Sequence, residues 1–530
     1  MMSALEKPHV VAVPFPALGH AIPLLDFARQ LASHGLLVSC VTTAANLPRL
    51  QHQMSDAISS GLDIRFVVLP TPAVEGLPEG IESFDKVPTE QCNLIFDLAL
   101  ALENSFDHWL EGVLENGGQE ERGVPVCIIN DILLGWSMEV SKRHNIPSVV
   151  FDTYGAFGLS LLNSAWLSAS KNVLKKEGET LVLSLDLPAP MRLEKHEIDA
   201  GLFDPFMMSI IGRLQSINQG SGMLVNTFEE LEADYLQHLR NLTGKMVWSI
   251  GPLLPPNCFG GAVKGSSRGK MADISEEELV RFLDSQSSCS VVYISFGSQT
   301  FLTEEQSKAL ASGLEASGQP FVWAIKVSPK MEPDASDAPI DLARTYLPEG
   351  FLERTKNRGL VIWGWVPQLV ILSHPSAGAF MSHCGWNSML ESVTLGVPLI
   401  TWPMYADQHF NSKLAVELGI GIQLCEHRTG IPDMHRVKEA LNLVLVDDNS
   451  KEIKRAAEKL KSVARKAVGY GGSSKANLQD FVGEIQKLKM ARKAVALRAY
   501  LKPQIQEDFV PEIHQLSVSK NCIDVSSPLE

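Results

Sequence analysis

The stretch that decides the fold covers residues 365–408 and reads WVPQLVILSHPSAGAFMSHCGWNSMLESVTLGVPLITWPMYADQ. Its small, apolar run at 377–381 is typical of a buried strand, and a polar turn follows. A helix then begins, in which Ser388 and Glu391 fit the S-x-x-E capping box and Gly396 closes the C-terminal end. A strand, a polar turn and an exposed helix N-terminus form a phosphate site in many α/β proteins, because backbone N–H groups and the helix dipole point at the anion. On these residues alone, an ordinary strand–helix unit is an equally good interpretation.

The alternation of apolar strands with helical stretches continues along the whole chain. In the N-terminal half, apolar runs predict strands at 9–15, 36–42, 64–69, 125–130, 148–151 and 222–226. In the C-terminal half, they predict strands at 290–296, 321–326, 360–363, 377–381, 397–402 and 419–424. Strands that alternate with helices indicate doubly wound α/β domains. Two such domains bind their ligands at the carboxyl ends of the strands, so we expect the functional site in a cleft between them.

The 530 residues suit two domains and a C-terminal segment. We assign residues 1–252 to an N-terminal Rossmann-like domain and 273–470 to a C-terminal Rossmann-like domain. Between them, 253–272 predicts an exposed linker, because much of it is rich in Gly, Ser and Lys and lacks apolar periodicity. Residues 471–530 are expected to form a helix that packs back towards the first domain. A basic amphipathic extension at 489–502 and a disordered tail would follow.

Composition argues against several kinds of partner. The chain is 45% hydrophobic and 20% charged, as soluble globular proteins are. Its net charge of −15 argues against nucleic acid or an anionic membrane as a partner. No apolar run approaches the length of a membrane span, and no signal-peptide pattern is present. The eight cysteines form no C-x-x-C pair, which suits reduced thiols. We therefore expect a cytoplasmic protein, and we also expect a monomer.

Two titratable residues lie where the carboxyl ends of predicted strands meet. His20 follows the first strand and opens a helix, and Asp131 follows the strand at 125–130. A helix N-terminus disfavours the imidazolium, so His20 would be a neutral ring able to accept a proton, with Asp131 bonded to its other nitrogen. The structural alternative places both residues at helix starts as capping groups. Spacing alone does not separate the two interpretations.

Residues 365–408 resemble, almost position for position, the signature box of plant family 1 UDP-sugar-dependent glycosyltransferases. The shared motifs are W-x-P-Q, H-C-G-W-N-S-x-x-E, G-V-P and the closing Asp-Gln pair, and the similarity covers most of residues 8–488. The resemblance implies the GT-B fold, in which two Rossmann-like domains face each other across a cleft. It implies that the domain at 1–252 binds the acceptor and that the domain at 273–470 binds the UDP-sugar. It also implies transfer of glucose from UDP-glucose to a hydroxyl of a small lipophilic acceptor, with inversion to a β-glucoside. Leu18 departs from the pattern, because many members carry Gln there.

The resemblance also implies roles for individual residues. His20 becomes the general base and Asp131 the carboxylate that orients it. Trp365 would stack on uracil, with Gln368 and the Val366 backbone completing recognition of base and ribose. Glu391 would bind the ribose hydroxyls rather than close the capping box. The remaining donor contacts would be Ser298, His383, Asn387 and Ser388 to the diphosphate, and Trp386, Asp407 and Gln408 to the sugar.

Other functions and cofactors are less consistent with the sequence. His383 and Cys384 lack a further ligand at metal spacing and no D-x-D pair is present, so we expect no metal and no cofactor beyond UDP-glucose as co-substrate. A nicotinamide-dependent oxidoreductase would share the strand–helix repeats, but no G-x-G-x-x-G follows the first strand. A non-catalytic binder on the same fold would not need both His20 and Asp131. The acceptor, and whether oxygen, nitrogen, sulfur or carbon is glycosylated, stay open.

Overall fold

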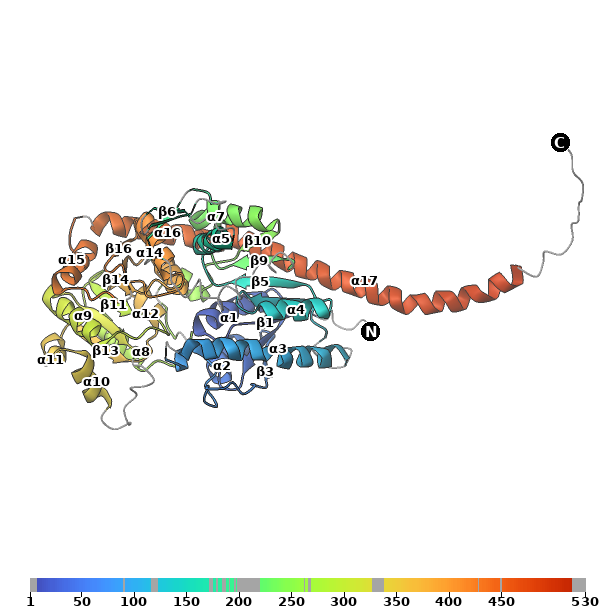
Figure 1. Ribbon diagram of the computed structural model, residues 1–530, viewed down its shortest axis with the longest axis horizontal. Helices are drawn as coiled ribbons and strands as arrows, with labels where there is room; N and C mark the ends of the chain where they lie inside the picture. The colour runs from blue at the N-terminus through green and yellow to red at the C-terminus, as the bar shows by residue number, and fades with distance from the viewer. Residues whose placement is uncertain are drawn as a thin grey trace, which may run out of the picture.

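The computed structural model describes residues 7–88, 91–115, 123–170, 175–177, 180–183, 187–189, 191–194, 197, 220–261, 263–265, 268–326, 338–427, 429–448 and 450–516. Two large parallel sheets, one in each half of the chain, are each packed between helices (Figure 1). The doubly wound α/β architecture is therefore confirmed for both halves. A small antiparallel sheet that the sequence did not predict joins β6 (Lys175–Glu177), β7 (Thr180–Leu183) and β8 (Met191–Leu193).

The N-terminal sheet has the strand order β10-β9-β5-β4-β1-β2-β3. In β1, alternate residues are buried in two different cores: Val10 and Ala12 pack on one face of the sheet, and Val11 and Val13 pack on the other. This burial on both faces explains why the strand is a continuous apolar run. The strands are β1 (His9–Val13), β2 (Leu37–Thr43), β3 (Ile64–Leu69), β4 (Cys127–Asp131), β5 (Ser148–Asp152), β9 (Gly222–Val225) and β10 (Met246–Ser249). The helices are α1 (Leu18–Ser33), α2 (Leu47–Ser59), η1 (Phe84–Lys86), α3 (Cys92–Glu115), α4 (Gly135–Arg143), α5 (Ala156–Ser170) and α7 (Glu229–Thr243).

The C-terminal sheet repeats this plan with the order β13-β12-β11-β14-β15-β16. Its strands are β11 (Val291–Ser295), β12 (Phe321–Ile325), β13 (Gly359–Trp363), β14 (Ala377–Ser382), β15 (Leu399–Thr401) and β16 (Gly421–Gln423). The first helices are η6 (Pro256–Phe259), α8 (Glu276–Asp284), α9 (Glu304–Ser317), α10 (Ala338–Tyr346), α11 (Phe351–Thr355) and α12 (Gln368–Ser373). The later ones are α13 (Trp386–Leu395), α14 (Gln408–Glu417), α15 (Met434–Leu445) and α16 (Ser450–Val468).

Each sheet changes its direction of winding between two central neighbouring strands, β1 and β4 in one and β11 and β14 in the other. A crevice forms outside the carboxyl ends of strands at such a point, because the connections leave in opposite directions. His20 lies just after β1, and Asp131 is the last residue of β4. In the other sheet, Ser298 lies after β11 and His383 follows β14. The topology therefore brings candidate residues to both crevices.

The connection between the sheets differs from the predicted exposed linker. Cys258 and Val263 are buried in the core that lies mainly in the C-terminal half, and the Arg268 side chain is only 9% exposed. The prediction of an exposed linker is wrong for these three residues. The local composition indicates a polar segment, but it does not reveal ion pairs that a buried cation such as Arg268 forms with residues of the two domains. Arg268 has two such partners, Asp26 and Glu391.

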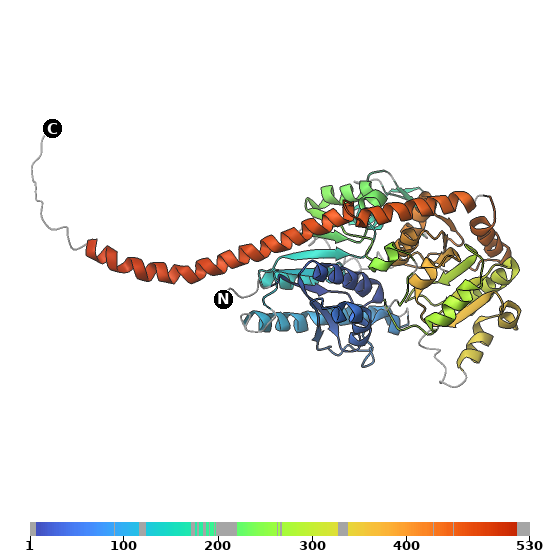
Figure 2. The same ribbon diagram turned by 180° about the vertical axis from the view of Figure 1, so that it is seen from behind.

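The last helix, α17 (Ser473–Leu516), runs along the N-terminal domain and projects beyond it (Figure 2). Its residues Leu478, Phe481, Val482 and Ile485 are buried in the core beneath β10 and α1. The helix continues past the expected end of the extension at 502, so the prediction of disorder from there is wrong as far as residue 516. Residues 517–530 lie outside the described part of the chain.

We predict that Phe481→Ala destabilises the N-terminal domain by about 3 kcal/mol, the usual cost of removing a buried aromatic ring. The Phe481 side chain is 1% exposed and packs against Phe27 and Trp248. Urea unfolding followed by tryptophan fluorescence measures the change. Lys487→Ala on the exposed face of α17 is the control and should leave stability unchanged. A loss below about 1 kcal/mol for Phe481→Ala would contradict the packing of α17.

Candidate active site

A cavity of about 850 Å³ lies between the two sheets at the carboxyl ends of their strands. Both domains line it, with Gly19, His20 and Tyr154 among the N-terminal residues. Every donor-side residue singled out in the sequence contributes to the same wall: Ser298, Trp365, Val366, Gln368, His383, Trp386, Asn387, Ser388, Glu391, Asp407 and Gln408. Asp131 stands behind His20. The fold thus collects into one cavity residues that are more than 300 positions apart in sequence.

His20 and Asp131 form a hydrogen-bonded pair. His20 is the third residue of α1, and its Nδ1 lies 2.9 Å from Asp131 Oδ2. The Asp131 carboxylate is fully buried, and its other oxygen accepts the Leu133 backbone N–H at 3.0 Å. An ionised Asp131 accepts a hydrogen bond from Nδ1–H, so a neutral His20 ring keeps its proton on Nδ1 and presents an unprotonated Nε2. The Thr153 hydroxyl also lies 3.3 Å from Nδ1, which further restrains the ring.

The capping interpretation of the pair is wrong. Ala17 is the N-cap residue of α1 and Leu134 is that of α4. His20 is the third residue of its helix rather than its cap, and Asp131 still belongs to its strand. Both side chains are therefore committed to each other rather than to helix ends.

On the donor side of the cavity, Gln368 is held by three polar neighbours. Its Oε1 accepts the Tyr293 hydroxyl at 3.0 Å, and its Nε2 donates to Ser388 Oγ at 3.1 Å and to the Glu391 carboxylate. The Glu391 side chain is only 4% exposed, so its charge is largely removed from water. These hydrogen bonds therefore hold the Gln368 amide and the Glu391 carboxylate in one fixed arrangement.

Trp365 is fixed through its backbone. Asp273 accepts the Trp365 N–H at 2.6 Å, and the Asp273 N–H donates to the Trp365 carbonyl at 2.8 Å. Gly364 makes this pairing fit, because it has a φ of +131° and a side chain there would collide with Asp273. The Trp365 ring is thereby placed on the wall of the cavity, where the flat face of an aromatic base could stack on it.

The predicted capping box at the start of α13 is absent. Gly385 is the N-cap residue, no side chain caps the first turn, and Ser388 is the third residue of the helix rather than its cap. The motif match was misleading because the N-cap residue, Gly385, lies three residues before Ser388, where the motif placed it. The uncapped first-turn N–H groups of a helix carry partial positive charge and suit an anion. Gly396, with a φ of +74°, ends the helix as expected.

His383 lies beside this helix start and is neutral. Burial lowers the pKa of its ring to about 4. Gly297 and Gly385 lie against the Nε2 atom, where a Cβ at either position would come within 2.5 or 2.6 Å. The absence of side chains at both glycines lets the ring reach the cavity wall, where a neutral imidazole can share a hydrogen with a phosphate oxygen.

The residues implied as sugar contacts lie at the domain boundary. The Trp386 indole donates to the Asn226 carbonyl of the N-terminal domain at 2.7 Å. Gln408 Oε1 accepts the backbone N–H groups of Met404 and Tyr405, so its amide nitrogen is the group left for a ligand. Burial raises the pKa of the Asp407 carboxyl to about 6.

Asn387 joins the two helix starts directly. Pro23 lies within α1 and has no N–H, so the Gly19 carbonyl four residues earlier lacks its helical partner. The Asn387 side-chain nitrogen donates to this carbonyl at 2.7 Å. The residue before the candidate base is thus bonded to the first turn of the candidate phosphate-binding helix.

Sequence reasoning missed several cations in the cleft. Lys326 donates to the Ser298 and Asp85 carbonyls, and burial lowers the pKa of its ammonium to about 8. Burial alone would raise the pKa of the Asp85 carboxyl, but Lys270 and Arg49 hold it well below its usual range. A single Lys or Arg outside a motif gives no signal in the sequence, because its partners come from distant segments.

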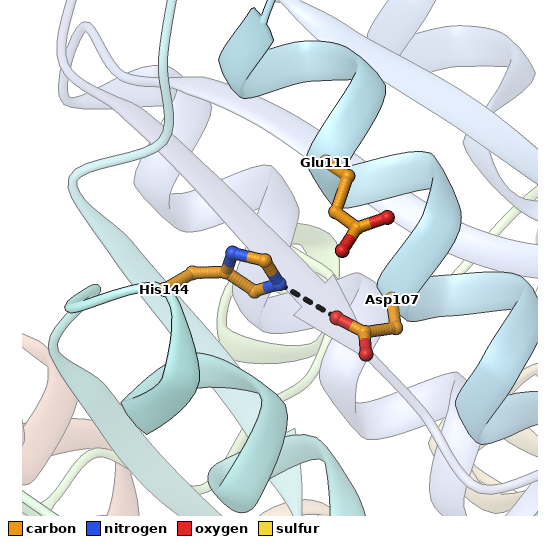
Figure 3. Close-up of side chains that lie close together, drawn as sticks. All are labelled: Asp107, Glu111 and His144. Carbon is orange, nitrogen blue, oxygen red and sulfur yellow. Dashed lines mark hydrogen bonds and ion pairs between the residues drawn. The ribbon is translucent and has the colours of Figure 1, made fainter.

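One further cluster of side chains lies on α3 and at the C-terminal end of α4, away from the cleft. Asp107, Glu111 and His144 approach closely enough to hold an ion, and His144 Nε2 lies 2.6 Å from Asp107 (Figure 3). Arg143 also pairs with Asp107 at 2.7 Å. None of the three lines the cavity, and an arginine already neutralises the shared carboxylate. The geometry is that of a surface ion-pair network.

Comparison with known proteins gives consistent results for both halves. Residues 6–255 match the family "Glycosyltransferase, N-terminal domain", and residues 225–463 match "UDP-glucoronosyl and UDP-glucosyl transferase". Scopoletin glucosyltransferase of Nicotiana tabacum is 35% identical over 90% of this chain and 98% of its own length. UDP-glycosyltransferase 73C5 of Arabidopsis thaliana is 34% identical over 91% of this chain and 97% of its own length.

Solved structures agree with these matches. UGT73P12 of Glycyrrhiza uralensis, complexed with glycyrrhetinic acid 3-O-monoglucuronide, superposes with a TM-score of 0.80 at 27% identity, over 94% of this chain and 99% of that one. Arabidopsis thaliana UGT89C1, complexed with UDP-L-rhamnose, gives 0.70 at 29% identity, over 91% and 100%. In the part of the chain described here, no helix has the length and apolar character that crossing a membrane requires. The similarity over nearly the whole chain, in sequence and in the two facing domains, shows that the protein belongs to the plant family 1 UDP-glycosyltransferases and has the GT-B fold.

Proposed function

We propose that this glycosyltransferase moves glucose from UDP-glucose to a hydroxyl of a small lipophilic acceptor, with His20 as the general base. The observation that carries the proposal is the shared cavity: His20, which is hydrogen-bonded to Asp131, lines the same cavity as the donor-side residues. A base must lie within hydrogen-bond reach of the proton that it removes, and this arrangement allows it. Apolar side chains such as Leu18, Ile22 and Ile81 line the N-terminal part of the cavity and suit a lipophilic acceptor.

Glucose is proposed as the sugar on the basis of the family box and its relatives. The box carries Trp386 and closes on Gln408, as expected for glucosyl transfer, and a relative 35% identical is named a glucosyltransferase. UGT89C1, which was solved with UDP-L-rhamnose, shows that donors differ among similar folds. Competition between UDP-glucose and other UDP-sugars therefore tests the donor separately from the reaction.

The proposed reaction is one in-line displacement. The acceptor hydroxyl gives its proton to His20 Nε2 while its oxygen forms a bond to the anomeric carbon, and the bond from that carbon to the diphosphate oxygen breaks. Asp131 stabilises the imidazolium that forms. The uncapped N–H groups at the start of α13 stabilise the charge that grows on the departing UDP, so a divalent ion would not be required for this role.

A single displacement is proposed because the Asp131 and Asp407 carboxylates already have other hydrogen-bonding partners. Asp131 is bonded to His20, and Asp407 accepts the Asn411 amide at 2.8 Å. Neither carboxylate is placed to attack the sugar as a nucleophile in this scheme. The α-linked donor should therefore yield a β-linked product. None of the seven cysteines in the described residues forms a disulfide, which supports the reducing cytoplasm as the place of action.

We predict that His20→Ala lowers kcat by about a hundredfold or more, as the loss of a general base does. UDP binding, measured by calorimetry, should stay close to that of the wild type because the donor contacts lie in the other domain. His144→Ala is the matched control, since that histidine pairs with Asp107 outside the cavity. Activity of His20→Ala within tenfold of the wild type would exclude His20 as the base.

Product stereochemistry tests the displacement. Incubation with UDP-glucose and a panel of phenols, followed by mass spectrometry, identifies acceptors and measures UDP release. Proton NMR of the purified product should then show the large anomeric coupling of a β-glucoside. A small coupling, typical of the α-anomer, would rule out a single inversion. If no acceptor of the panel receives glucose but some receive a sugar from another UDP-sugar, the donor assignment would be overturned.

Donor affinity should depend on pH through Asp407. Above about pH 6 the carboxyl is ionised and accepts hydrogen bonds from sugar hydroxyls, and below it the carboxyl binds a proton and loses much of this capacity. The Kd of UDP-glucose should therefore rise as the pH falls from 7 to about 5. Asp407→Asn should bind more weakly and show a flatter pH dependence. The same slope in both proteins would assign the titration to another group.

A further inference from the structure

Arg268 is the cation that meets the donor-side carboxylate. Its Nε donates to Asp26 at 2.8 Å, and its Nη1 donates to Glu391. All three side chains are nearly buried, with exposed fractions of 9% for Arg268, 3% for Asp26 and 4% for Glu391. Buried charges at hydrogen-bond distance are strongly coupled, because little water screens them.

Both carboxylate oxygens of Glu391 can still accept further hydrogen bonds. Arg268 bonds Oε1, and Gln368 bonds Oε2. An ionised carboxylate accepts about four hydrogen bonds, so each oxygen keeps capacity for a hydroxyl donor. The two protein donors fix the plane of the carboxylate and leave room for a pair of ligand hydroxyls.

Asp26 connects this arrangement to the helix that bears the base. It lies on α1, six residues after His20, and also accepts the Gln53 amide at 3.4 Å. Burial raises the pKa of its carboxyl, and the Arg268 guanidinium opposes that rise. Without the guanidinium, two buried carboxylates would face each other without a shared cation.

The backbone around Arg268 is adapted to this place. Gly269 has a φ of +88°, and a side chain there would come within 2.5 Å of the Trp365 ring. Lys270 then pairs with Asp85 of the N-terminal domain. Residues 268–270 thus lie along the wall of the cavity beside the residues assigned to uracil and ribose.

We propose that Arg268 is a positioning residue for the donor, which orients Glu391 to receive the ribose hydroxyls while Asp26 anchors its guanidinium. The inference rests on the proposed function, in which Glu391 binds the ribose. It gives the inter-domain connection a part in donor recognition through Glu391 and links the donor site to the helix that carries His20.

Calorimetry with UDP as the probe tests this role in the full-length protein without any acceptor. The Kd of UDP for R268M should rise about tenfold or more, because a misoriented Glu391 would lose a charge-assisted hydrogen bond from a ribose hydroxyl. R268K should recover part of the affinity, because an ammonium supplies the charge without the planar fork that serves both carboxylates. D26N should weaken binding in the same direction but less. The double variant D26N/R268M should be no weaker than R268M, because Asp26 acts through Arg268.

A matched control separates positioning from general stability. Arg240 also pairs with a glutamate and a backbone carbonyl, but it lies outside the cavity. R240M should lower the unfolding midpoint without changing the Kd of UDP. With a phenol acceptor, R268M should raise the KM for UDP-glucose and change kcat much less, which a loss of folded protein would not do.

The outcomes that overturn the inference are distinct. An unchanged Kd of UDP for folded R268M would show that Arg268 has no part in donor binding. Tighter binding would show that Arg268 obstructs the site. If R268M does not fold, R268K and D26N decide, and wild-type affinity in both would reject the role. Failure of the wild type to bind UDP would overturn the proposed function and this inference with it.

Discussion

The N-terminal turns of α1 and α13 face each other across the cleft, and the hydrogen bond from Asn387 to the Gly19 carbonyl joins them. The bond exists because Pro23 removes the helical partner of that carbonyl. Both helices begin where a central strand of their sheet ends, so both dipoles place partial positive charge at the same gap. A diphosphate suits this gap on electrostatic grounds. Because His20 follows Gly19 directly, the same bond sets the separation between the base and the donor side.

The chain carries a net charge of −15, yet the cleft is supplied with cations. Arg268, Lys270 and Lys326 line it, and each reaches it from a segment with no recognisable motif. A global field of negative sign would repel a UDP-sugar at long range, but within a buried site local charges dominate because they are poorly screened. The anion is therefore proposed to be held by nearby guanidinium, ammonium and backbone N–H groups rather than by the overall charge.

The chain passes between the two domains twice, and residues in or after each connection hold the domains together. The first places Arg268 between Asp26 and Glu391, whose carboxylates belong to different domains. The second leads from α16 into α17, which returns to the N-terminal domain and buries Phe481 there. Ion pairs and apolar packing thus hold the two crevices opposite each other. The cavity between them depends on these contacts as much as on either sheet.

The sequence by itself determined the fold class, most strands of the two large sheets and the donor-side residues of the signature box, because buried parallel strands are continuous apolar runs and the box has fixed spacing. Residues near the ends of β1, β4, β11 and β14 could be expected to converge, since the switch point of a doubly wound sheet places them there. Only the tertiary structure decided that Ser388 lies inside α13 rather than capping it, because a helix start depends on the turn before it. Only the tertiary structure placed Arg268 against Glu391, 123 positions away, because a charge inside a polar segment acquires its partners when the domains pack together.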